Sequence, residues 1–196
     1  MTLRKARAQG LCHSAGQEDA PMILIAYATT EGQTEKIARF CAERLEAGGQ
    51  AATLLHLQTG AEDMPECDAA ILAASVHMGR YQDAIEGFAL RHAQALTARR
   101  TLFLAVSLAA AGHDADEWAD LDRIAQAFQA RTGWQAGKTC QVAGAFRFTK
   151  YDFFRRLAMR WIAWQKGEEV NPHDDREYTD WAALSTEIDA FAARIA

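Results

Sequence analysis

Residues 22–34 read MILIAYATTEGQT, an unbroken apolar run that leads into a short loop of threonine, glutamate, glycine and glutamine. Apolar residues without polar alternation are typical of a strand that is buried on both faces, as in a parallel sheet. After the loop, Ile37, Phe40, Cys41 and Leu45 recur at helical spacing, and Gly48–Gly49 ends the predicted helix. The stretch therefore predicts a buried strand, a loop and a helix in immediate succession.

The same alternation continues to the end of the chain. Further strands are expected at residues 51–57, 69–74, 101–107 and 139–146, and helices around residues 85–96, 118–128 and 181–195. This order predicts an α/β fold in which an open five-stranded parallel sheet carries helices on both faces. We expect one domain at residues 22–196, preceded by a disordered extension at residues 1–21 that begins basic and continues small and polar.

Composition excludes several classes of protein. The chain has 196 residues and a formal net charge of −5, which argues against a nucleic-acid-binding domain. Its four cysteines are scattered and have no metal-site spacing, so no bound metal is expected and a reducing cytoplasm is the natural compartment. No apolar run approaches the roughly 20 residues that span a bilayer.

The loop after the first strand has the chemistry of a phosphate site. Hydroxyls of Thr29, Thr30 and Thr34 can donate to phosphate oxygens, Gly32 permits a tight turn, and the helix start adds free N–H groups. The loop lacks the lysine of a P-loop and the G-x-G-x-x-G pattern of dinucleotide-binding folds. A simple N-capped turn is the alternative interpretation.

The stretch IAYATTEGQTEKIA resembles the signature of the flavodoxins, in which such a loop grips the phosphate of flavin mononucleotide (FMN). The resemblance implies a sheet of strand order 2-1-3-4-5 with FMN at its switch point. The implied phosphate-binding residues are Thr29, Thr30, Glu31, Gly32, Gln33 and Thr34.

The loop after the third strand, ASVHMGRY at residues 74–81, resembles a narrower group, the menaquinone-dependent protoporphyrinogen IX dehydrogenases. Residues 142–148 and 178–181 resemble the same family. By position, this loop and the loop after the fourth strand would border the flavin ring. The implied contacts are Ser75, Val76, His77, Met78, Gly79 and Tyr81 from the first of these loops and Ser107, Leu108 and Ala109 from the second.

Alternatives stay open for several of these residues. Gly79 would let a peptide group approach the flavin closely, because it has no Cβ. His77 is either a donor near the ring or a solvated loop residue, and Tyr81 either stacks on flavin or packs under the next helix. The loop after the fourth strand either contacts flavin or forms a wall on the substrate side. No residue stands out as catalytic.

Residues 150–166, KYDFFRRLAMRWIAWQK, form the most unusual segment, within an insertion expected at about residues 150–177. Plotted as a helix, Phe153, Leu157 and Trp161 share one side, and Arg156 and other basic residues lie opposite. A basic, aromatic amphipathic helix is typical of a segment that lies in a membrane interface. A helix that caps the core is the alternative.

The family resemblance implies an FMN-dependent oxidation of protoporphyrinogen IX to protoporphyrin IX, a step of haem biosynthesis. Electrons would pass to a membrane quinone, and the protein would lie in the cytoplasm at the inner face of the cell membrane. The alternatives are a flavodoxin-type electron carrier and another FMN-dependent quinone reductase. A receiver-type signalling domain is disfavoured, because Ala73-Ala74-Ser75 stands where such a domain needs an aspartate.

Overall fold

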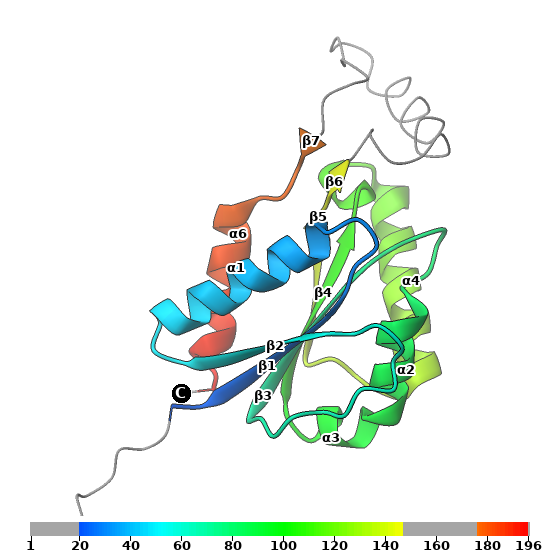
Figure 1. Ribbon diagram of the computed structural model, residues 1–196. Coiled ribbons are helices and arrows are strands. Elements are labelled where there is room, and N and C mark those ends of the chain that lie inside the picture. The colour runs from blue at the N-terminus through cyan, green and yellow to red at the C-terminus, as the bar shows by residue number, and fades with distance from the viewer. Residues whose placement is uncertain (1–19, 147–175, 196) are drawn as a thin grey trace, which may run out of the picture.

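Five parallel strands form the centre of the molecule, in the order β2-β1-β3-β4-β5 (Figure 1). The computed structural model describes residues 20–146 and 176–195. The strands are β1 (Met22–Ala28), β2 (Ala51–His56), β3 (Ala69–Ser75), β4 (Arg100–Ser107) and β5 (Lys138–Ala143). In the register of the sheet, Ile25 of β1 lies opposite Leu54 of β2 and Ile71 of β3. The predicted fold class and strand order are confirmed.

Helices cover both faces of the sheet (Figure 1). They are α1 (Gln33–Ala47), α2 (Asp83–Arg91), α3 (Ala93–Thr97), the 3₁₀ turn η1 (Ala109–Ala111), α4 (Ala115–Thr132) and α6 (Trp181–Ala192). Side chains of α1 and α6 pack into one buried apolar cluster, and those of α2 and α4 pack into the other. The central strands contribute to both clusters, because successive residues of a strand face opposite sides.

Two predicted elements are divided in the structure. The helix expected around residues 85–96 breaks at His92, whose ring contacts the backbone oxygen of Glu62 at 2.9 Å. The strand expected at residues 139–146 divides at Gly144, which leaves β6 (Ala145–Phe146) to pair in antiparallel fashion with β7 (Arg176–Glu177). Both divisions occur where the chain contacts segments that are distant in sequence. The spacing of apolar residues along a helix or strand carries no information about such contacts.

The segment 150–166 and residues 1–19 lie outside the described residues, so the membrane-interface helix and the disordered extension stay predictions. Among residues 20–146 and 176–195, no helix is long and apolar enough to cross a bilayer.

Helices α2 and α4 are joined by a two-point ion pair that gives a pH-dependent prediction. Nε and Nη2 of Arg131 donate to the two carboxylate oxygens of Glu86 at 2.9 and 3.0 Å. These hydrogen bonds hold the pKa of Glu86 below its ordinary value. Arg131→Met is therefore expected to lower the free energy of unfolding by about 1 kcal/mol near neutral pH. The loss should shrink as the pH falls through the depressed pKa of Glu86, because a protonated carboxyl gains little from Arg131.

Urea unfolding at about pH 7 and about pH 4 measures this effect. Arg123→Met is the matched control, since Arg123 pairs with Asp120 on the exposed surface of the same helix. That variant should change the free energy of unfolding by less than about 0.5 kcal/mol at either pH. Equal losses in the two variants would contradict the assigned role of the Arg131–Glu86 pair.

Candidate cofactor site

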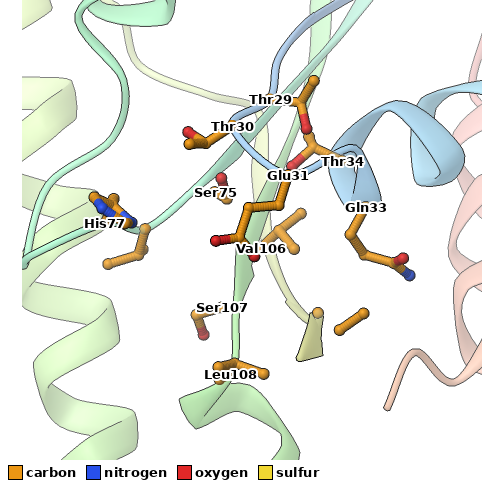
Figure 2. A pocket seen from close by; sticks show the side chains of 13 residues that line it. Thr29, Thr30, Glu31, Gln33, Thr34, Ser75, His77, Val106, Ser107 and Leu108 are labelled. Carbon is orange, nitrogen blue, oxygen red and sulfur yellow. The ribbon is translucent and has the colours of Figure 1, made fainter. Parts of the chain in front are cut away.

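A pocket opens at the carboxyl ends of the central strands (Figure 2). The chain leaves β1 towards one neighbouring side of the sheet and leaves β3 towards the other side. The pocket lies between these two exits, at the switch point where open α/β sheets bind ligands. Figure 2 shows His77 at one side of the shared space and Gln33 at the other. The lining residues are Thr29, Thr30, Glu31, Gln33, Thr34, Ser75, Val76, His77, Val106, Ser107, Leu108, Gly144 and Ala145.

The loop between β1 and α1 has the backbone geometry of an anion site. Gly32 adopts φ 91°, a left-handed conformation that favours glycine, and its N–H donates to Oγ1 of Thr29 at 2.9 Å. No side chain caps α1, whereas Asp114 caps α4 and Asp180 caps α6. The first N–H groups of α1 therefore have no capping side chain where a phosphate would lie.

The loop after β3 folds into a tight turn. Backbone hydrogen bonds join His77 and Arg80 in both directions, at 2.7 and 3.2 Å. Met78 and Gly79 have φ values of 51° and 78°, the pattern of a type I′ turn. A Cβ added to Gly79 would meet no atom within 4 Å, so its φ is what favours glycine in this structure. The N–H of Val76 donates to the oxygen of Val106 at 2.8 Å, which ties the loop to β4.

A partly buried polar network joins the pocket to the strand that leads to α6. Nε2 of Gln33 donates to Oε1 of Glu177 at 3.1 Å and to Oγ1 of Thr179 at 2.9 Å. Thr179 in turn donates to the oxygen of Ala143 at 2.7 Å, and Lys36 reaches Glu177 at 2.6 Å. Burial raises the pKa of Glu177, but the hydrogen bonds from Lys36 and Gln33 outweigh burial and leave that pKa below its ordinary value.

The polar groups of the pocket suit a flavin phosphate bound by neutral donors. Among the described lining residues there is no lysine or arginine, and Glu31 and His77 are the ionisable side chains. The threonine hydroxyls and the start of α1 lie at one end of the pocket, and Ser107 lies beside Leu108 at the other end (Figure 2). Small and apolar side chains, including Val76, Val106 and Leu108, form another part of its wall. A Cβ on Gly144 would approach Val106 Cγ1 to 3.3 Å, so glycine keeps this wall open.

Ten of the fifteen residues predicted for the site line the pocket, and five do not. The five are Gly32, Met78, Gly79, Tyr81 and Ala109. Gly32 shapes the phosphate loop without lining the pocket. The side chain of Met78 is 81% exposed.

The ring of Tyr81 lies in the core, between Phe103 at 5.0 Å and Phe128 at 5.1 Å. Burial raises the pKa of its hydroxyl. Of the two alternatives for Tyr81, the structure therefore shows packing in the core. Its side chain does not line the pocket in which it was predicted to contact the cofactor.

Three lining residues were missed, namely Val106, Gly144 and Ala145. Each stands at or just beyond the carboxyl end of β4 or β5. The rule that ligands bind at these strand ends could have found Gly144 and Ala145, had it also been applied to the fifth strand, and Val106, had it included the last residues of the fourth strand as well as the loop after it.

Comparison with known proteins agrees with this geometry. Residues 24–172 match the family model described as "Flavodoxin domain". A protoporphyrinogen IX dehydrogenase [quinone] of Escherichia coli strain K12 is 28% identical over 174 residues, covering 88% of this chain and 93% of that one. The protein of the same name from Leishmania major is 26% identical, covering 89% and 76%. A flavodoxin from Streptococcus pneumonia TIGR4 superposes with a TM-score of 0.53 at 20% identity, covering 88% and 99%.

An open parallel sheet of this strand order, with a pocket of neutral polar groups at its switch point, has the arrangement of a flavodoxin-like protein. The chain belongs to the flavodoxin domain family. Its cofactor is FMN, and the protein is an FMN-dependent oxidoreductase.

Proposed function

We propose that this protein oxidises protoporphyrinogen IX to protoporphyrin IX and delivers the electrons to a quinone, as a step of haem biosynthesis. The observation that carries the proposal is the similarity to two relatives named for this reaction, along 88% and 89% of the chain. The curated relatives come from a bacterium and from Leishmania, so the resemblance does not depend on one organism.

Different residues of the pocket are assigned to the phosphate and to the ring of FMN. We assign the FMN phosphate to the hydroxyls of Thr29, Thr30 and Thr34 and to the first N–H groups of α1. The ring would lie between the loop Ser75–His77 and the ends of β4 and β5. When bound, FMN supplies the redox centre, and the chain's own residues hold and orient it and limit its contact with water.

Purified holoprotein tests the proposal directly. Under anaerobic conditions, protoporphyrinogen IX and a menaquinone analogue should together give a rise in porphyrin fluorescence. Omission of the quinone should stop the rise once the bound flavin is reduced. A flavin-loaded, folded protein that forms no porphyrin above the enzyme-free rate would overturn the substrate assignment and leave the FMN assignment intact.

The second candidate is a flavodoxin-type electron carrier, favoured by the fold that the chain shares with solved flavodoxins. A carrier would exchange electrons with protein partners and would show no porphyrin formation in the same assay. The two functions therefore give opposite results in one experiment.

Contact with a quinone-bearing membrane belongs to the same proposal. Its support is the pattern of basic and aromatic residues in the segment 150–166. Sedimentation of the full chain with anionic vesicles, compared with a variant lacking residues 150–166, tests it. Equal binding by both proteins would remove this segment from the proposal.

A further inference from the structure

The hydroxyl groups of the pocket have a common hydrogen-bonding pattern. Oγ1 of Thr29 accepts from the N–H of Gly32 at 2.9 Å, and Oγ of Ser107 accepts from the N–H of Ala110 at 3.1 Å. A hydroxyl oxygen that accepts from an N–H group keeps its own proton free to donate. The protons of both hydroxyl groups therefore remain available to an acceptor, which suits an anionic ligand.

The side chain of Gln82 extends this pattern to two further hydroxyls. Its Nε2 donates to Oγ of Ser75 at 2.6 Å and to Oγ1 of Thr30 at 3.3 Å. Gln82 immediately precedes α2 and does not line the pocket itself. Its amide group connects Thr30, in the loop after β1, with Ser75 at the end of β3, and both residues are shown in Figure 2.

The orientation of the amide group decides what the two hydroxyls can do. An amide nitrogen carries two hydrogens, and here both are directed at hydroxyl oxygens. In the reverse orientation, the amide oxygen would accept from Thr30 and Ser75, and the proton of Thr30 would no longer be available to a phosphate oxygen. Oε1 of Gln82 is buried and has no hydrogen-bond partner within the described residues.

We propose that Gln82 is a positioning residue: its hydrogen bond to Ser75 anchors the amide group, which holds the hydroxyl of Thr30 as a phosphate donor and thereby sets the preference of the pocket for FMN over riboflavin. This inference rests on the phosphate site assigned above. Gln82 acts through the two hydroxyls and does not touch the cofactor. This role of Gln82 also explains how a pocket with no lysine or arginine among its described lining residues can favour a negatively charged ligand. Neutral donors held in a fixed orientation take the place of a cationic side chain.

The test measures binding and not turnover. FMN and riboflavin are titrated separately into the full chain freed of flavin, and quenching of flavin fluorescence gives each dissociation constant. Gln82→Met keeps the length of the side chain and removes its donors. We expect FMN to bind about tenfold more weakly and riboflavin to change by less than about twofold. An unchanged ratio of the two constants would overturn the proposal.

A double-mutant cycle separates positioning from a general loss of structure. In a Thr30→Val, Ser75→Ala background, Gln82→Met should change the FMN-to-riboflavin ratio by less than about twofold, because its targets are gone. The same loss in both backgrounds would show that the amide acts independently and would sink the proposal. If Gln82→Met does not fold, Gln82→Asn, whose shorter amide cannot span both hydroxyls, takes its place with the same expectations.

Thr34→Val distinguishes failure of this inference from failure of the site. Thr34 lines the pocket and is not one of the two hydroxyl groups to which Gln82 donates, so its loss should reduce the preference for FMN independently. If Thr34→Val reduces the preference and Gln82→Met does not, only the role of Gln82 is wrong. If neither variant changes it, the phosphate site and the role of Gln82 both fall.

Discussion

Replacing Gly60 by alanine is expected to lower the free energy of unfolding by about 3 kcal/mol. Gly60 has φ 78°, which strains any residue with a Cβ. An added Cβ would also lie 2.7 Å from the oxygen of Ala84 and 3.1 Å from Cα of Gly87, both backbone atoms of α2. Backbone atoms cannot rotate away as a side-chain end can, so the loop after β2 must move off the helix. Urea unfolding of the variant and the parent protein measures the loss.

Gly49→Ala is the matched control for this prediction. Gly49 has φ 86°, but an added Cβ would meet no atom within 4 Å. The control variant therefore has the backbone strain without the steric clash, and it should lower the free energy of unfolding by about 1 kcal/mol. The difference between the two variants reports the close approach of the loop to α2. Equal losses in both would mean that this approach contributes nothing to stability.

Most of the sheet could be predicted from local sequence, because a strand buried on both faces has a composition of its own. The apolar run at residues 22–27 and the similar run at residues 102–106 both fall within observed strands. The threonines of the loop after β1 could be placed at the pocket for the same reason, since they are close together in the sequence. Features that are formed by residues close together in the sequence could therefore be predicted from the sequence alone.

Features that depend on distant partners were not within reach. His92 breaks a helix because its ring meets the backbone of Glu62, thirty residues earlier. The polar residue Gln82 looks like ordinary surface until the structure places its amide group on Thr30, fifty-two residues away. Tyr81 stands four residues after His77, which lines the pocket, yet its ring packs on Phe103 and Phe128. Residues that are close together in the sequence therefore need not have side chains that lie close together in the site.

Replacing Gln33 by glutamate is expected to lower the free energy of unfolding by about 3 kcal/mol near neutral pH. The side chain of Gln33 is 7% exposed, and its Nε2 lies 3.1 Å from Oε1 of Glu177. A second carboxyl there would face Glu177 and would have a raised pKa in the folded state. Below the ordinary pKa of glutamate, the new group would be protonated and could donate as glutamine does. The loss should therefore grow as the pH rises from about 4 to about 7.

Gln33→Met is the control that separates charge from lost hydrogen bonds. It removes the bonds to Glu177 and Thr179 without adding a carboxyl, so it should cost about 1 to 2 kcal/mol near neutral pH. Because Gln33 is one of the donors that lower the pKa of Glu177, this cost should shrink slightly towards pH 4, and its change with pH should be smaller than that of the glutamate variant. If the difference between the two variants stays flat from about pH 4 to about pH 7, Gln33 and Glu177 are not in contact. Gln33 also lines the pocket. The glutamate variant should therefore weaken binding of FMN more than binding of riboflavin, because its charge repels the phosphate. One side chain would then link the stability of the β7 segment to recognition of the cofactor.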